Sequence, residues 1–334
     1  MDLTPGPRSL DSSVAWSIVL TGPYCGEPGC EMADAATLNC AKPQVPTAAA
    51  ADAPLLAPSP LFAMLSDRGR VRHSNQDACA ALPEHGVFVV CDGMGGAAAG
   101  EVASHLTTEA FMDCLARAPQ SSATGSATRP RARLAEAIRA ANQAVYRHSR
   151  KLPSLHGMGT TLVALLRHDD AQRPEDVPTS PRLWIAHVGD SRCYLFRSGE
   201  LRLLTQDHSL VEEQVRAGVL SRVQATASPM RNIITRAIGT QPTVEPEIAL
   251  HAAQPGDLYL LASDGLSREL DNGEISEILT RTASPAALAT GRRDTVAPGL
   301  APQSALDSAC HALIDAANAK GGRDNITVLL VACP

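Results

Sequence analysis

Aromatic residues are scarce in this 334-residue chain, at 3% of its positions. Aliphatic residues must therefore supply most of the 44% hydrophobic content that builds a core, and a chain of this length can bury one large core or two smaller ones. An excess of positive charge is also missing, because the formal net charge is −6. Nucleic-acid binding depends on clustered Lys and Arg side chains, so this charge argues against nucleic acid as a partner.

Long apolar runs are missing too. No stretch reaches the roughly 18 apolar residues of a membrane-spanning helix, so we expect no membrane association. The stretch VAWSIVL at 14–20 is short, follows both Asp and Arg, and lacks a small-residue cleavage site. These features favour a local strand or a disordered segment over a signal peptide, and we expect a cytoplasmic protein.

The chain has nine cysteines, and six of them lie in or beside apolar segments. That placement is typical of small buried residues in a reducing cytosol. The other three, Cys25, Cys30 and Cys40, have no fourth ligand nearby at a regular spacing. A zinc site in this stretch is therefore disfavoured.

Residues 1–58 differ in composition from the rest of the chain. They include an Ala/Pro tract with almost no charge, AKPQVPTAAAADAPLLAPSP at 41–60, which predicts a disordered N-terminal extension. Residues 59–334 are predicted to form one globular domain. Its predicted strands come in hairpin-linked groups with helices in pairs between them, which favours an α+β fold with antiparallel sheets over alternating βαβ units.

Aspartates recur at the ends of the predicted strands. Three follow apolar runs and two open one, namely Asp92, Asp190 and Asp264, and Asp77 and Asp324. Burying an unpaired carboxylate costs roughly several kcal/mol, so this repeated placement suggests a shared cation. Hard divalent cations prefer oxygen ligands, and no His or Cys joins these positions at zinc spacing, so magnesium or manganese fits better than zinc.

Two other interpretations are open at this point. Gly93, Gly95 and Ala98 match the G-x-G-x-x-A dinucleotide fingerprint, although the carboxylate of Asp92 would repel a pyrophosphate. Ser191 could be a hydrolase nucleophile paired with His208, although no nucleophile elbow surrounds it. A P-loop is excluded because the chain has no G-K-[ST] sequence.

In order along the chain, eight segments resemble the motifs of the metal-dependent Ser/Thr protein phosphatases of type 2C, in their bacterial form. They are SDRGRVRHSNQDA, VVCDGMGG, GMGTTLVALL, AHVGDSRCYLFRSGEL, LTQDHS, ITRAIG, LLASDGL and RDNITVLLV. The resemblance covers residues 61–333. It implies a sandwich of two antiparallel sheets with helices on both outer faces and a metal centre in a cleft at one end.

The resemblance also implies a role for each aspartate. Asp92 would bridge two manganese or magnesium ions, and the Gly93 carbonyl would add a ligand. Asp264 and Asp324 would complete the shell of one ion, and Asp77 would act through bound water.

Further roles follow from the same resemblance. Asp190 would help to hold a third, weaker ion, and Arg72 would bind the substrate phosphate with its planar fork. Two positions depart from the family pattern: Gln76 stands where many members have Glu, and Met94 stands where animal members have a His proposed as general acid. A thioether cannot donate a proton, so the proton donor is open; His208 is a candidate, although a structural role suits it better.

The implied activity is hydrolysis of phosphoserine and phosphothreonine in proteins by a metal-activated water. The expected partners are phosphorylated proteins and a cognate Ser/Thr kinase, and we expect a monomer. The alternative is a type 2C-like regulatory or phosphoprotein-binding module with little turnover, which a missing metal ligand would favour. A nucleotide-binding protein outside the cytoplasm is a third possibility, against which the odd cysteine count and the missing export signal weigh.

Overall fold

The structure is a computed structural model that describes residues 17–19, 60–117, 130–168, 182–283 and 302–333. The three cysteines considered for zinc and the Ala/Pro tract at 41–59 lie outside these residues. The boundary between an extension at 1–58 and a domain at 59–334 therefore stays a prediction.

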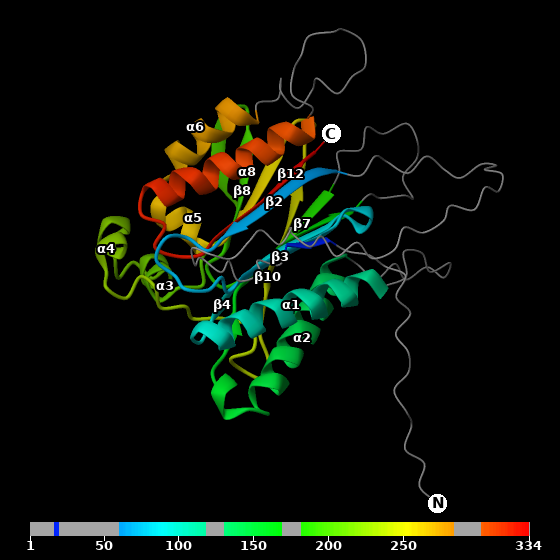
Figure 1. Ribbon diagram of the computed structural model, residues 1–334, viewed down its shortest axis with the longest axis vertical. Coiled ribbons are helices and arrows are strands. Elements are labelled where there is room, and N and C mark those ends of the chain that lie inside the picture. The colour runs from blue at the N-terminus through cyan, green and yellow to red at the C-terminus, as the bar shows by residue number, and fades with distance from the viewer. Residues whose placement is uncertain (1–16, 20–59, 118–129, 169–181, 284–301, 334) are drawn as a thin grey trace, which may run out of the picture. The chain divides into compact units, whose positions relative to one another are not determined.

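Two antiparallel sheets form the centre of the described part (Figure 1). The larger sheet has the order β1-β3-β4-β6-β7-β10, with β5 paired to β4, and the smaller has the order β2-β12-β11-β8-β9. The strands of the larger sheet are β1 (Ser17–Val19), β3 (Asp77–Leu82), β4 (Val87–Met94), β5 (Gly159–Thr160), β6 (Leu162–His168), β7 (Arg182–Val188) and β10 (Glu247–Ala252). Those of the smaller sheet are β2 (Leu61–Asp67), β8 (Arg192–Arg197), β9 (Glu200–Leu203), β11 (Leu258–Ala262) and β12 (Ile326–Ala332).

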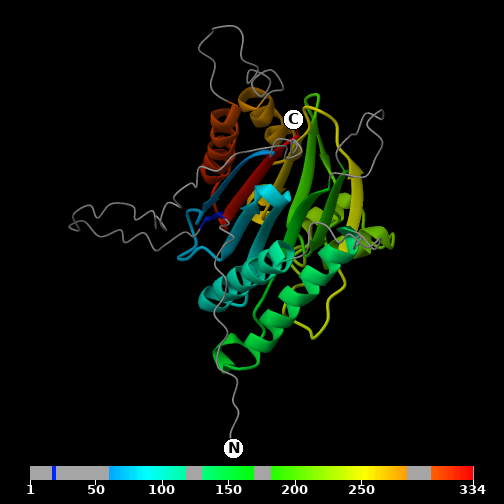
Figure 2. The same cartoon turned by 90° about the vertical axis from the view of Figure 1, so that its right-hand side faces the viewer.

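Helices cover the outer faces of both sheets, and Figure 2 shows the strands between the two groups. On the larger sheet lie α1 (Ala97–Arg117) and α2 (Pro130–Ser149); on the smaller lie α5 (Asp264–Glu269), α6 (Asn272–Thr282) and α8 (Pro302–Ala319). Two further helices, α3 (Leu210–Arg216) and α4 (Arg222–Ala227), form a segment between β9 and β10. The expected α+β sandwich with helices on both outer faces is thus confirmed. No described helix is long and apolar enough to cross a membrane.

Side chains of β4 alternate between two apolar layers. Val87, Val89 and Cys91 pack toward α1 and α2, whereas Phe88 and Val90 lie between the sheets. A slip of one residue would exchange the two faces and turn Asp92 toward α1 and α2, so the position of its carboxylate depends on the strand's register. The same alternation directs the next residue of the Phe88 and Val90 set, Asp92, toward the space between the sheets at one end of the sandwich.

Two local details differ from the expectations. Strand β4 continues past Asp92 to Met94, because β5 pairs with its last two residues. Asp264 begins helix α5 one residue after Ser263, which follows β11, and does not end the strand itself. In the segment after β9 both short helices have a serine N-cap: Ser209 accepts from the Glu212 N–H and Ser221 from the Gln224 N–H.

Strand β1 lies within the segment predicted to be an extension. It pairs with β3 through Ser17–Ala81, Ile18–Ala80 and Val19–Cys79. This agrees with the interpretation of VAWSIVL as a local strand.

Candidate metal centre

Four aspartates from the two sheets come together at one end of the sandwich. Asp77 on β3 and Asp92 on β4 are direct cross-strand partners. Asp264 follows β11 and Asp324 precedes β12, and these two strands are neighbours in the smaller sheet. The Thr327 hydroxyl on β12 donates to Asp77 Oδ2 over 2.7 Å, which joins the sheets at this end.

A cavity of about 460 Å³ opens beside these carboxylates. Asp92, Asp264 and Asp324 line it, together with Gly93 and Arg72. A second cavity, of about 640 Å³, shares Arg72, Asp264 and Asp324 with the first and adds Asp190 and residues of α3 and α4. The structure therefore brings all the predicted site residues to one cleft except Asp77, which lies buried behind Asp92.

Several buried carboxylate oxygens of this cluster have no hydrogen-bond partner within the described residues. They are Oδ1 of Asp77, Asp190 and Asp264, in residues that are each less than 9% exposed. Leaving such atoms unpaired is costly unless a cation meets them. An all-oxygen donor set with orphaned carboxylates is what Mg²⁺ or Mn²⁺ prefers, so the residues present fit the implied ions.

The pKa values of the cluster show how closely the charges are packed. Burial, followed by the charges of Asp77, Asp264, Asp190 and Asp324, raises the pKa of Asp92 well above its usual range. Burial raises the pKa of Asp77 to about 6, with hydrogen bonds from neighbouring hydroxyls opposing it. Each carboxylate would lose its proton more readily beside a positive charge, which again favours a bound cation.

Gly93 is packed too tightly for a side chain. Its N–H donates to the Gln76 carbonyl oxygen over 3.1 Å, and a Cβ atom there would lie 2.6 Å from that oxygen and would also meet the Gly100 carbonyl. The glycine lets the end of β4 pack closely against Gln76 and Gly100 beside the cavity, where its own carbonyl can serve as the implied ligand.

Asp190 sits in the turn after β7. Gly189 precedes it with φ +104°, a left-handed conformation that favours glycine, and a Cβ there would meet the side chain of Thr161. The neighbouring Arg192 does not pair with Asp190: it donates to both carboxylate oxygens of Asp207, over 3.0 and 2.7 Å. Arg192 is therefore the ion-pair partner of Asp207.

Two arginines reach the carboxylates, and the sequence analysis identified only one of them. Arg72 donates from Nη2 to Asp324 Oδ2 over 2.8 Å with its side chain half exposed. Arg268 on α5 forms ion pairs with Asp264 and, over 3.1 Å, with Asp324. The signal that could have revealed it is its position four residues after Asp264, because residues at i and i+4 lie on one helix face.

The alternative nucleophile is not accessible. Ser191 is 1% exposed, and its hydroxyl lies 2.6 Å from that of Thr161. His208 is fully buried and lines neither cavity, so it cannot serve as proton donor in the cleft. The glycine motif at 93–98 lies between an antiparallel strand and α1, which is not the βαβ setting of a dinucleotide site.

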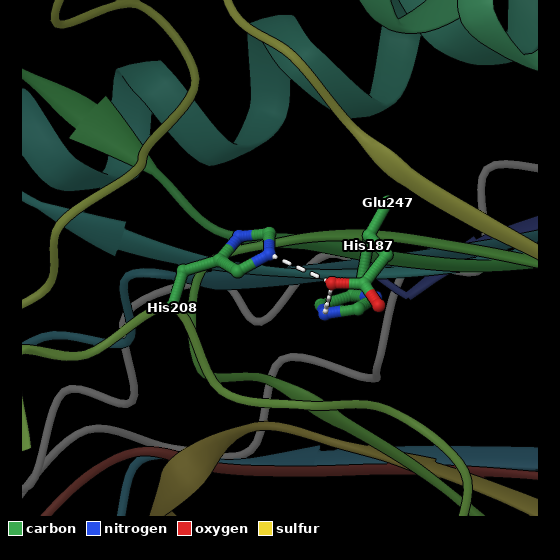
Figure 3. A group of neighbouring side chains, drawn as sticks. All are labelled: His187, His208 and Glu247. Atoms are coloured by element: carbon green, nitrogen blue, oxygen red, sulfur yellow. Dashed lines mark hydrogen bonds and ion pairs between the residues drawn. The ribbon is translucent and has the colours of Figure 1, made fainter. Parts of the chain in front are cut away.

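A separate cluster joins His187, His208 and Glu247 (Figure 3), whose ligating atoms all lie within 4.8 Å of one another. The Gly189 N–H donates to His208 Nδ1 over 3.2 Å, so the proton of the neutral ring is on Nε2, which faces Glu247 Oε2 at 3.4 Å. His187 Nε2 faces the Gln206 carbonyl over 2.8 Å and is therefore also protonated.

Both nitrogens that face Glu247 are thus hydrogen-bond donors, which a metal ion could not use without rearrangement. Burial, the neighbouring His187 and Arg236 together lower the pKa of His208 to about 4, which keeps the ring neutral. The cluster links β7, the segment before α3, and β10, and we assign it a structural role.

Similarity to known proteins agrees with this site. Residues 68–297 match the family described as Protein phosphatase 2C. The serine/threonine phosphatase stp of Listeria monocytogenes is 34% identical over 269 residues, which are 80% of this chain and 93% of that protein. The serine/threonine protein phosphatase PstP of Mycobacterium tuberculosis is 36% identical over 269 residues, which are 80% of this chain and 44% of that longer protein.

Solved structures give the same result. The structure of the Mycobacterium tuberculosis phosphatase PstP/Ppp superposes with a TM-score of 0.63 at 35% identity and covers 82% of this chain and 98% of its own. A structure of the PstP catalytic domain in complex with two manganese ions has a TM-score of 0.62 at 34% identity, covering 82% of this chain and 99% of its own. The sequence resemblance is confirmed, and this chain belongs to the protein phosphatase 2C family.

Proposed function

We infer that the chain hydrolyses phosphoserine and phosphothreonine in proteins in a metal-dependent reaction. The observation that carries this inference is the convergence of Asp92, Asp264 and Asp324 from the two sheets on one solvent-open cleft, with buried carboxylate oxygens left unpaired and an arginine at the rim. The serine/threonine phosphatases of Listeria and Mycobacterium share this chain's fold and family.

Each site residue has a proposed role. Asp92, Gly93, Asp264 and Asp324 would hold two divalent ions, and Asp77 would orient the water around them. When bound, such ions act as Lewis acids and lower the pKa of water toward neutrality. The chain itself collects the carboxylates, leaves Oδ1 of Asp77, Asp190 and Asp264 without a partner among the described residues, and positions the side chains through the strands beside them.

Arg72 is the proposed phosphate-binding residue. Its guanidinium lies at the mouth of the cavity, half exposed and anchored on Asp324. A planar fork of this kind can bind two phosphoryl oxygens at once and stabilise the charge that develops on them.

The direct test is an assay of the full chain on a phosphothreonine peptide, with manganese and with a chelator. We expect phosphate release with manganese and none with the chelator. Manganese-independent hydrolysis would contradict the metal-dependent mechanism. Tight peptide binding without release would instead support the regulatory-module alternative.

The finer assignments belong to the same proposal. Residues 59–334 would form the catalytic domain, and a Ser/Thr kinase would supply the substrates. Five cysteines of the described residues, Cys79, Cys91, Cys114, Cys193 and Cys310, are free thiols, which supports a reducing cytoplasmic compartment. We also propose that the chain acts as a monomer and that Asp190 helps to hold a third, weaker ion.

Arg72→Lys should lower kcat/KM for the phosphopeptide by about tenfold, because lysine keeps the charge but loses the two-pronged contact. The measurement is steady-state kinetics at saturating manganese, with Arg222→Lys as the matched control. Arg222 lines the neighbouring cavity and pairs with Glu212, so its variant should keep wild-type kinetics. Equal losses in both variants would refute the assignment of Arg72.

Asp190→Asn should lower turnover on the order of 10²-fold, about 2.7 kcal/mol of transition-state stabilisation, and extra manganese should partly restore it. Melting should not suffer, because burial and the charge of Asp207 raise the pKa of the Asp190 carboxyl in the fold despite the opposing effect of Arg268, so its charge is unfavourable there. Asp207→Asn is the contrasting variant: it breaks the Arg192 pair and should lower the melting temperature. Full turnover of Asp190→Asn with a clearly lowered melting temperature would exclude the third-ion role.

A further inference from the structure

Arg268 occupies an unusual place in the metal centre. It lies on α5 one helical turn after Asp264, and its Nη2 forms an ion pair with Asp264 Oδ2. Its Nη1 donates to Asp324 Oδ2 over 3.1 Å, so one guanidinium bridges two carboxylates that come from different elements. The side chain lines both cavities of the cleft and is 36% exposed.

The charges around Arg268 hold it there. Burial alone would lower its pKa, but Asp264, Asp190, Asp324 and Asp92 outweigh this effect and raise the pKa. The guanidinium therefore stays charged and feels the same carboxylates that would bind the divalent ions.

Almost all carboxylate oxygens of Asp264 and Asp324 already have a hydrogen-bond or ion-pair partner. Asp324 Oδ1 accepts the N–H of Asn325 over 2.9 Å, and Asp324 Oδ2 accepts from both Arg72 and Arg268. Asp264 Oδ2 is engaged by Arg268, which leaves only Asp264 Oδ1 without a partner. A divalent ion held by Asp264 and Asp324 must therefore share or take oxygens from Arg268.

The side chains of Arg72 and Arg268 differ in how easily they can move away from the carboxylates. Arg72 lies between β2 and β3, is 49% exposed and contacts one carboxylate. Arg268 lies on a helix whose first residue is itself one of the proposed ligands, so its backbone stays one helical turn from Asp264. Its side chain is less exposed, at 36%, and contacts two carboxylates.

We propose that Arg268 is a built-in competitor of the divalent ions. Its guanidinium offsets the charge of Asp264 and Asp324 and lowers their affinity for metal, and thus sets the metal concentration at which the phosphatase becomes active. Metal binding and the Arg268 contacts oppose each other reciprocally, as any two linked equilibria must. This inference rests on the proposed metal-dependent function.

The test is calorimetric titration of manganese into the chelator-treated full-length chain and its Arg268→Met variant. We expect the variant to bind manganese about tenfold more tightly, because a like charge beside the ion has been removed. In chelator the variant should melt at a lower temperature than the wild type, since the carboxylates lose their internal counter-ion. Saturating manganese should remove this difference.

Two further variants sharpen the result. Arg222→Met removes the same charge from the rim of the second cavity, where the side chain pairs with Glu212 and does not contact the proposed ligands; its manganese affinity should change by less than about twofold. Arg268→Lys keeps the charge but loses the bridge, and its affinity should lie between those of the wild type and the Met variant. It also keeps the experiment decisive if Arg268→Met fails to fold.

Unchanged or weaker manganese binding in the Arg268 variants would overturn the proposal, as would an equal gain in Arg222→Met. If the wild type and the variants bind manganese with equal affinity, only the competition fails. If neither the wild type nor any variant binds manganese, the metal site and the proposed function fail together with the proposed competition.

Discussion

Replacing Asp92 by Asn should abolish manganese-dependent hydrolysis of a phosphopeptide while leaving the fold intact. Asp92 is the carboxylate on which the charges of the other four aspartates act, and it is proposed to bridge both ions. Its loss should lower kcat by at least roughly 10³-fold, or about 4 kcal/mol of transition-state stabilisation. Turnover is measured at saturating manganese.

The stability of the same variant gives an independent check. The pKa of Asp92 is raised in the fold, so the unfolded chain loses this proton first and the native state becomes less stable as pH rises above the ordinary aspartate range. Asp92→Asn removes that penalty, and in chelator near pH 7 it should melt at or above the wild-type temperature. Asp113→Asn, which affects only an exposed ion pair with Arg117 on α1, should keep wild-type turnover. Near wild-type turnover of Asp92→Asn would refute the assignment of the metal centre.

Replacing Gly93 by Ala should cost both stability and activity. The new methyl group would meet the Gly100 carbonyl and lie 2.6 Å from the Gln76 carbonyl oxygen, and both are backbone atoms that cannot turn away. Relieving this overlap should lower the free energy of unfolding by about 3 kcal/mol. Asp92 directly precedes Gly93, and Asp77 directly follows Gln76. The substitution should therefore also displace one of these aspartates, so manganese binding should weaken as well.

Denaturant unfolding and manganese calorimetry measure the two effects separately. Gly273→Ala is the control, since a Cβ there meets only the Asp271 side chain at 3.2 Å. It lies in the first turn of α6, where Ala is a better helix former than Gly, so its stability should be unchanged or slightly higher. A Gly93→Ala protein as stable as the wild type, with normal manganese affinity, would show that the close packing at Gly93 is not needed.

Short apolar runs were enough to predict the strands around the centre. In β4 both faces are buried, and the short run that ends near Asp92 still predicts a strand because its length and β-branched residues favour one. Repetition then gave the site prediction: one aspartate at a strand end is common, but five, four of them beside Gly, Ser or Asn, indicate a shared ligand. Both signals come from residues that are close together in the chain, so a single sequence is enough to detect them.

The sequence by itself thus determined the element types, the end of the sandwich at which the carboxylates gather and the class of ion they suit, because each depends on residue type and spacing. Only the tertiary structure decided which residues distant in the sequence contact one another. It showed that Asp77 and Asp92 are cross-strand partners and that Arg192 belongs to Asp207. It also placed Arg268 on Asp324, 56 positions away. Such contacts depend on strand register and on the packing of one sheet against the other, which long-range burial sets and residue spacing alone does not encode.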